Sequence, residues 1–102
     1  MPPIGGFATA ADRADHFNRH VTIQREFTFV DEEEYEAAAI AFMNKPADGM
    51  TIKEHLRMRD NTTVRVDVTT FEFCFVHGGT YIGSYYIART ADIEAYFRRR
   101  CR

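Results

Sequence analysis

The sequence of 102 residues lacks three features: a long apolar run, a framework of cysteines and a strong excess of one charge. No apolar stretch approaches the roughly 18 residues that a membrane-spanning helix needs. The first residues have neither the basic nor the apolar region of a signal peptide. The two cysteines, Cys74 and Cys101, fall in an expected strand and in the C-terminal tail, which favours free thiols and a reducing compartment. We therefore expect a globular protein that folds through its apolar core.

The net charge is only −2, which argues against a protein that holds nucleic acid by charge alone. The charge is nevertheless unevenly distributed. Residues 1–56 carry five Lys or Arg against ten Asp or Glu, a net of −5, whereas residues 57–102 carry eight against five, a net of +3. The C-terminal half is thus the part suited to a polyanionic partner.

A chain of this length forms one domain that buries roughly 60 to 65% of its unfolded surface. We expect a flexible segment over residues 1–8 and a single domain over residues 9–102. The stretch 64–88 predicts three strands, because apolar and polar residues alternate over 64–69 and again over 71–76. Gly78 and Gly79 provide the positive φ angles that a two-residue hairpin turn requires. Residues 52–59 alternate in the same way and predict a further strand before these three.

The spacing of the turns predicts which side chains lie opposite one another. If residues 60–62 form the first turn, Arg57 faces Arg65 and His55 faces Asp67. The next two hairpins extend the row of His55 and Asp67 to Glu72 and Tyr85. They extend the row of Arg57 and Arg65 to Cys74 and Gly83. We expect both rows to lie on an open face of the sheet. Two arginines directly opposite each other are unfavourable unless an anion or a carboxylate lies between them.

Capping residues mark three helices. Thr9 and Asp12 predict a helix from about Ala10 to His20, Asp31 predicts a second one that ends before Pro46, and Thr90 predicts a short C-terminal helix. Residues 21–30 read as a short strand or an extended connection. The expected fold is therefore α+β, with N-terminal helices packed on a four-stranded antiparallel meander sheet and a short C-terminal helix.

Two histidines, His16 and His20, lie one helical turn apart on a face that does not carry the apolar stripe. By position they are not core residues, and imidazole is the side chain best suited to move protons near neutral pH. Two other interpretations remain open. One is a metal site completed by Asp12, although the glutamate of the zincin pattern is missing between the histidines. The other is a pair of solvated surface histidines.

Cleavage of RNA without metal needs a base for the ribose 2′-hydroxyl, an acid for the leaving 5′-oxygen and fixed groups on the phosphate. His16 and His20 are candidates for the base and the acid, and Arg65 and Arg57 for the phosphate. A hydroxyl from Ser84, Tyr85 or Tyr86 is a candidate for orienting it. A second candidate set is Glu72 and His55 with the same arginines, which is similar to the chemistry of barnase. No cofactor or metal is required by either set.

Several stretches carry a resemblance to a family, namely His16-Phe17-Asn18-Arg19-His20, Tyr35 to Phe42, Val64 to Phe73, and Ser84-Tyr85-Tyr86 after a glycine turn. Over about residues 14–88 the chain resembles the C-terminal RNase toxin domains of bacterial polymorphic and contact-dependent growth inhibition systems. These are small α+β modules of the barnase/EndoU/colicin/RelE type. The resemblance implies functional roles for His16, His20, Arg65 and the segment 84–86. Because side chains alternate along a strand, we expect Ser84 and Tyr86 on the face that carries Phe71, Phe73 and Phe75, which we call the phenylalanine face, and Tyr85 on the opposite face.

The resemblance implies a metal-independent endoribonuclease that cleaves RNA, with tRNA as the expected substrate, through attack of the 2′-hydroxyl and a 2′,3′-cyclic phosphate product. It also implies a cognate immunity protein and delivery from a secreted or surface effector into the cytoplasm of a target cell. The alternative is a non-catalytic α+β binding module, such as an immunity or adaptor protein, whose sheet face and histidines bind a partner.

Overall fold

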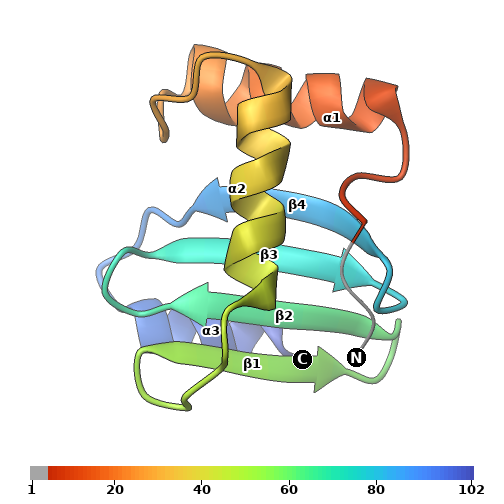
Figure 1. Cartoon of the computed structure of the whole chain (residues 1–102). Helices are drawn as coiled ribbons and strands as arrows, with labels where there is room; N and C mark the ends of the chain where they lie inside the picture. Colours follow the sequence, from red (N-terminus) through yellow and green to blue (C-terminus); the bar gives the residue numbers. More distant parts are fainter. Residues whose placement is uncertain (1–4) are drawn as a thin grey trace.

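The computed structural model describes residues 5–102 and confirms the expected α+β class. Four antiparallel strands follow one another in the sheet in chain order. The sheet lies between helices, with α2 across one face, α3 behind the other and α1 at the edge next to β4 (Figure 1). The elements are α1 (Ala10–Phe17), η1 (Asn18–Ile23), α2 (Glu32–Asn44), β1 (Ile52–Arg57), β2 (Thr62–Asp67), β3 (Glu72–His77), β4 (Tyr81–Ile87) and α3 (Ile93–Arg100).

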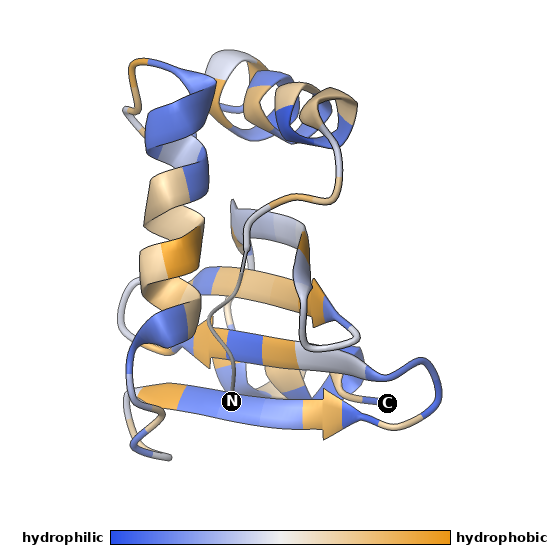
Figure 2. Ribbon diagram, turned by 45° about the vertical axis from the view of Figure 1, so that its right-hand side comes forward, coloured by the Kyte–Doolittle hydropathy of each residue, from blue (hydrophilic) through white to orange (hydrophobic). Residues whose placement is uncertain are grey.

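Both faces of the sheet are covered, so the open face expected from the sequence is not present. Apolar and polar residues alternate along β2, whereas β3 is apolar over most of its length (Figure 2). One apolar cluster lies under α2 and contains Tyr35, Phe42 and Cys74, whereas a second lies under α3 and contains Phe73 and Ile93. Each face of the sheet therefore has its own core. Cys74 and Cys101 are free thiols.

The first helix begins as expected but ends differently. The Thr9 hydroxyl accepts a hydrogen bond from the Asp12 amide at 3.1 Å, which confirms the predicted cap. After Phe17 the chain widens into a π-helix, η1, that continues through Ile23. A hydrogen bond from the Gln24 amide to the Arg19 carbonyl, five residues back, shows the wider winding. The predicted strand or extended connection over residues 21–30 is therefore helical in its first part and irregular in the rest.

The other two helices differ in their caps. The Asp31 carboxylate accepts from the Glu34 amide at 2.8 Å, as predicted for α2. The cap of α3 is Asp92, whose carboxylate accepts from the Ala95 amide at 3.0 Å. The prediction that Thr90 caps α3 is wrong, because its hydroxyl instead accepts from the Asp92 amide and shapes the turn before the helix.

The register between β1 and β2 differs from the prediction by three residues. A four-residue loop over 58–61 joins the strands, so Arg57 pairs with Thr62, Glu54 with Arg65 and His55 with Val64. Asn61 adopts a left-handed backbone with φ of 54°, which lets this longer loop close. Because an odd shift reverses the faces of a strand, the predicted opposition of Arg57 and Arg65, and that of His55 and Asp67, are both wrong.

The registers of the later hairpins keep the predicted faces. Arg65 pairs with Cys74 as expected. Gly78 and Gly79 both have positive φ, 61° and 71°, but the loop spans three residues and a bulge lies between Phe75 and Val76. These two changes shift β4 by an even number of residues, so Tyr85 pairs with Cys74 instead of aligning with Glu72. Ser84 and Tyr86 lie on the phenylalanine face and Tyr85 on the other, as the pleat predicted.

The N-terminal segment contributes to the sheet within the described part of the chain. The Ile82 amide donates to the Gly6 carbonyl at 2.8 Å, and Phe7 forms a parallel bridge with Ile82. The Phe7 ring is buried and stacks on Tyr35 at 5.8 Å. Residues 5–7 therefore belong to the fold, not to the flexible segment expected over residues 1–8, whose first four residues lie outside the description. Within residues 5–102 no helix is long and apolar enough to cross a membrane.

Candidate functional site

Three of the candidate residues meet at the edge of the sheet beside β4. The His16 and His20 rings stack with centroids 5.8 Å apart and planes 14° apart. The His20 ring in turn stacks on Tyr86 of β4, at 5.6 Å and 20°. The structure thus forms a column of two imidazoles and a phenol, which we call the histidine column.

Glu26 fixes the orientation of the His20 ring. One oxygen of its carboxylate lies 2.9 Å from His20 Nδ1, and the other accepts a hydrogen bond at 2.6 Å from the Ile87 amide of β4. The Glu26 side chain is only 4% exposed. A carboxylate on Nδ1 holds a proton there, so Nε2 is the nitrogen left to exchange a proton with a ligand. Nε2 is buried and has no hydrogen-bond partner among residues 5–102, so the ring is held at one nitrogen and unengaged at the other.

His20 is 7% exposed, and the interpretation of both histidines as solvated is therefore wrong for this residue. The sequence pattern assumed a single apolar stripe on a regular helix. In the structure Phe17 points to α2, where it meets Tyr35 edge-on at 6.1 Å. On the neighbouring side of the helix His20 meets Tyr86. The helix thus packs on two surfaces, and polar residues outside the predicted stripe are buried.

His16 completes the column on the side away from the sheet. Its ring stacks on Phe7 at 5.4 Å, and its Nδ1 is buried without a hydrogen-bond partner among the described residues. Burial lowers the pKa of His16 below its usual 6.5, and the nearby charges of His20 and Arg19 lower it further. The imidazole of His16 is therefore neutral at pH 7 and able to accept a proton.

Tyr86 connects the column to α3. Its hydroxyl shares a hydrogen bond of 2.8 Å with the Tyr96 hydroxyl, and the Arg100 guanidinium lies 4.8 Å above the Tyr96 ring. Burial raises the pKa of Tyr86, and the hydrogen bond with Tyr96 raises it further by a smaller amount. The Tyr86 hydroxyl therefore keeps its proton at neutral pH. Ser84 lies on the same face of β4, half-buried and paired with Phe75.

The structure does not bring Arg65 to the histidines. Arg65 is 3% exposed and donates to the Glu54 carboxylate at 3.1 Å and to the Phe42 carbonyl at 2.6 Å, and it also donates to the Lys45 carbonyl. These carbonyls belong to the C-terminal end of α2, where, within residues 5–102, the only other backbone bond to them is a long one of 3.4 Å from the Lys45 amide to the Phe42 carbonyl. Arg65 therefore anchors α2 to the sheet and is not free for a phosphate.

Arg57 is engaged in a similar way. It donates to Asp60 at 2.8 Å and to the Arg100 carbonyl at 2.8 Å. These bonds hold the hairpin loop between β1 and β2 and the end of α3. Arg57 pairs with Thr62, which lies three residues before Arg65 in β2. Because side chains alternate between the faces of a strand, Arg57 and Arg65 lie on opposite faces of the sheet.

The alternative set of Glu72 and His55 is not assembled either. The Tyr85 hydroxyl donates to Glu72 on the face covered by α2, where burial raises the pKa of Tyr85. His55 lies on the other face, beside Phe97 and Cys101 of α3. The sheet separates the two groups, so this interpretation is wrong. Tyr85 and Glu72 form a buried contact that stabilises the first core.

No group of three or more possible metal ligands occurs in the described part of the chain, and Asp12 makes no contact that joins it to the histidines. Glu26 and Tyr96 are members of the site that the sequence pattern did not predict. Glu26 offers one signal, an acidic residue six positions after His20 in a segment without regular pattern. Its pairing with His20 depends on the π-helix that turns the chain back, which the pattern did not reveal.

Comparison with known proteins adds no relative, since no protein-family model, no curated protein and no solved structure matches the chain.

Proposed function

We propose that this chain is a metal-independent ribonuclease whose histidine column exchanges protons with the substrate. His16 and His20 supply the base and the acid for attack of a ribose 2′-hydroxyl on the adjacent phosphate. The products are a 2′,3′-cyclic phosphate and a free 5′-hydroxyl. The contact that carries the proposal is the one between Glu26 and His20, which orients the imidazole and leaves Nε2 unengaged.

The environments of the two histidines suggest a division of roles. His16 has a lowered pKa and is neutral at pH 7, which suits the base that takes the 2′-hydroxyl proton. His20, whose ring is oriented by the Glu26 carboxylate, takes the remaining role of the acid that protonates the leaving oxygen. Tyr86 keeps its hydroxyl proton and can donate a hydrogen bond to the phosphate.

The positive charge for the phosphate comes from α3 in this proposal, not from Arg57 or Arg65. Arg99 and Arg100 lie over the Tyr96 ring at 5.8 and 4.8 Å, and Tyr96 is hydrogen-bonded to Tyr86. A guanidinium needs no change of protonation to neutralise a phosphate. A continuous set of contacts joins these arginines to the column, whereas Arg19, which also lies near His16, is paired with Asp15.

Substrate access requires a local opening, because His20 Nε2 is buried in this conformation. Two features of the segment suit such a movement. A π-helix is less stable than an α-helix and occurs often at functional sites, and Arg25 after it has a left-handed backbone with φ of 52°. The proposed site is therefore a closed form that opens around η1.

The biological role that we propose is a toxin domain in competition between bacteria, with tRNA as substrate. In this role an immunity protein blocks the histidine column, and a secreted or surface effector delivers the domain to the target cell. The support is the resemblance of residues 14–88 to RNase toxin domains together with the α+β fold and the paired histidines.

The test is incubation of the protein with total bacterial RNA in excess EDTA. We expect discrete cleavage by the unaltered protein and losses of roughly 10² to 10⁴-fold in His16→Gln and His20→Gln, which remove an acid or base. Glu26→Gln should lose less, because it removes the orienting group alone. The matched control is His77→Gln, which changes an exposed histidine outside the column and should leave cleavage unchanged. Intact RNA with folded, unaltered protein overturns the proposal.

A second candidate is a non-catalytic binding module. Its support is a set of exposed apolar side chains in and at both ends of β1, an edge strand of the sheet: Met50 is 78%, Leu56 44% and Met58 80% exposed. An edge strand flanked by exposed apolar groups is suited to pairing with a strand of a partner. Intact RNA in the experiment above, with tight binding of a partner that Met58→Lys weakens, would favour this candidate.

A further inference from the structure

We propose that the groove between β1 and α3, with the arginines at the end of α3, binds the backbone and one base of single-stranded RNA. This inference names a docking surface for the substrate of the proposed ribonuclease, and it rests on that function for its role. It concerns residues outside the histidine column. We call this surface the α3 groove; it is lined by Gly49, Lys53, Glu54, His55, Phe97, Arg98 and Cys101.

The cations come from the last turn of α3 and the C-terminal residue. Arg98, Arg99, Arg100 and Arg102 form no salt bridge with a carboxylate of residues 5–102. The hairpin between β1 and β2 adds Arg59, which donates to the Arg102 carbonyl at 2.7 Å, and Arg57, which donates to the Arg100 carbonyl. Unpaired guanidinium groups beside further cations attract a polyanion.

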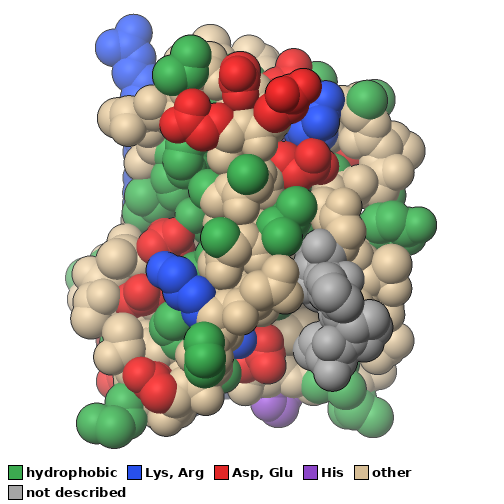
Figure 3. Space-filling model, in the orientation of Figure 1, with side chains coloured by type: hydrophobic (Ala, Val, Ile, Leu, Met, Phe, Trp, Pro, Cys, Tyr) green, Lys and Arg blue, Asp and Glu red, His purple; other side chains and the backbone are tan. Residues whose placement is uncertain are grey.

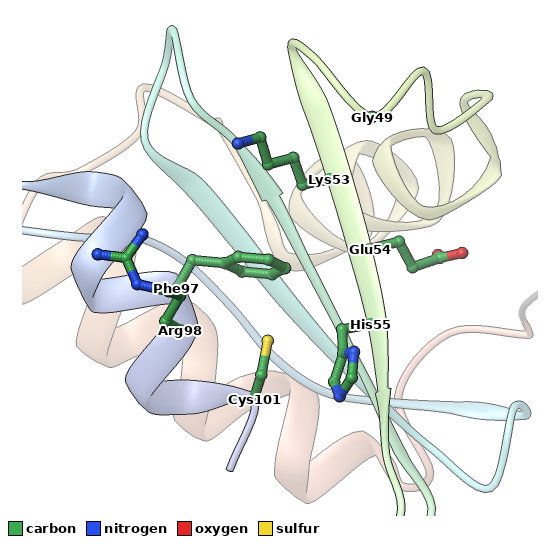
Figure 4. A pocket seen from close by; sticks show the side chains of 7 residues that line it. All are labelled: Gly49, Lys53, Glu54, His55, Phe97, Arg98 and Cys101. Atoms are coloured by element: carbon green, nitrogen blue, oxygen red, sulfur yellow. The ribbon is translucent and has the colours of Figure 1, made fainter.

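Most acidic residues of the chain lie elsewhere, although Asp60 follows β1 and pairs with Arg57, and Asp92 and Glu94 begin α3. Glu32, Glu33 and Glu34 occupy the first turn of α2, and acidic side chains gather around that end of the molecule (Figure 3). Glu54 has its backbone in the α3 groove, but its side chain points to the other side of the sheet (Figure 4), where it pairs with Arg65. The side chains that face the groove are therefore cationic, aromatic or neutral, apart from Glu94, which is bound by Lys53.

The groove has the size and lining for one nucleotide. Its volume is about 480 Å³, and it is open to solvent on one side. The Phe97 ring points from α3 into the space in front of β1, with the Cys101 thiol and the His55 ring beside it (Figure 4). An aromatic ring of this kind stacks with an unpaired base whatever its identity. Arg98 lies at the rim and is the cation for a flanking phosphate, whereas Lys53 is held by Glu94.

A continuous set of contacts joins this surface to the histidine column. Arg99 and Arg100 lie over Tyr96, the Tyr96 hydroxyl bonds to Tyr86, and Tyr86 stacks on His20. A strand that lies along α3 with one base in the groove thus continues toward the proposed acid and base. The outer face of α3 carries arginines without large apolar residues, which favours a nucleic acid over a lipid surface.

The test measures binding apart from cleavage. A fluorescent single-stranded oligonucleotide with 2′-O-methyl groups cannot be cleaved, and its affinity is measured over a range of salt concentrations. For each phosphate contact removed from a single strand, the magnitude of the negative slope of log K against log salt concentration falls by about 0.7. We expect this fall in Arg98→Gln and in Arg99→Gln, and no change in the control Lys45→Gln, which removes one charge beyond the end of α2.

Phe97 provides the second readout. Phe97→Leu should weaken binding by about 5- to 100-fold with an unchanged salt slope, because it removes stacking and not charge. Phe97→Tyr keeps the ring and should bind as the unaltered protein does. Circular dichroism confirms that each variant is folded, since Phe97 also contacts the second core.

Each outcome decides between alternatives. Equal effects of Lys45→Gln and Arg98→Gln, stronger binding to a duplex, or equal binding to anionic phospholipid vesicles would overturn the docking surface. Binding with the expected slopes but no RNA cleavage would overturn the ribonuclease and leave the surface in place. Cleavage that is unaffected in Arg98→Gln and Arg99→Gln, with unchanged binding, would leave the ribonuclease and overturn the surface.

Discussion

Single side chains at the β4 edge show how position changes the chemistry of one residue type. His16 and His20 are separated by one helical turn, yet only His20 has a carboxylate partner, Glu26. Burial of His16 without a partner for Nδ1 favours its neutral form. Two imidazoles in contact therefore differ in their surroundings, which suits them to different roles in acid and base catalysis.

The lowered pKa of His16 predicts a loss of stability in acid. Above pH 6.5 the imidazole is neutral in the folded and unfolded chains, and the stability is fully present. As the pH falls below 6.5, the unfolded chain takes up the proton first, so the free energy of unfolding decreases until the lower pKa of the folded state is passed. Urea unfolding at about pH 8 and about pH 5 should show a smaller decrease for His16→Gln than for the unaltered protein.

His77→Gln is the control for this measurement, because it removes an exposed histidine that does not belong to the column. It should retain the full decrease. Equal decreases for the unaltered protein and His16→Gln would show that other groups cause the acid sensitivity.

At the scale of elements, α2 is joined to the sheet at its C-terminal end by a buried cation. Arg65 of β2 binds the Phe42 and Lys45 carbonyls and the Glu54 carboxylate of β1. One guanidinium thus satisfies orphan carbonyls of a helix end and a carboxylate of a neighbouring strand. The residue that sequence reasoning assigned to a phosphate instead connects α2, β1 and β2.

Arg65→Ala should lower the free energy of unfolding by about 3 to 5 kcal/mol, because it leaves buried carbonyls and a carboxylate without their partner. Arg65→Lys should lose less, since it keeps the charge but not the planar fork. Urea unfolding measures both. Arg19→Ala, which removes an exposed pair with Asp15, should cost only about 0.5 kcal/mol.

Cleavage by the Arg65 variants separates the two roles proposed for this residue. A structural role predicts unchanged cleavage per folded molecule of Arg65→Lys. A large loss of cleavage in folded Arg65→Lys would instead indicate that Arg65 contacts the phosphate of the substrate.

The whole molecule is a sheet with a separate core on each face. Ile82 is buried in the core under α2, and Ile93 is buried in the core under α3. The two residues belong to different clusters on opposite faces of the sheet, so their side chains do not pack against each other. The backbone of the sheet is nevertheless common to both cores, which favours unfolding as one unit.

Ile82→Val and Ile93→Val should each lower the free energy of unfolding by about 0.5 to 1.5 kcal/mol. The double variant should equal their sum within about 0.5 kcal/mol, because the side chains share no partners. Denaturant unfolding followed by fluorescence and by circular dichroism should give one coincident transition. A coupling above about 1 kcal/mol, or two transitions, would contradict the picture of two cores on one cooperative sheet.

Local patterns in the sequence were sufficient for most of the elements, the π-helix η1 excepted. Alternation predicted the strands, Thr9 and Asp31 predicted the starts of two helices, and the positive φ of Gly78 and Gly79 followed from their position between two strands. Each of these depends on neighbouring residues alone. The predicted cap at Thr90 was wrong because a second capping residue, Asp92, follows it closely.

By itself the sequence determined the α+β class, the meander order and the pairing of two histidines, because these depend on short-range patterns of polarity and on turn residues. Only the tertiary structure decided which residues share a site. Loop lengths set the register of β1, a bulge set that of β4, and the π-helix brought Glu26 to His20. A shift of one residue in any of these reverses a face, so the partners of Arg65, His55 and His20 could not follow from spacing along the chain.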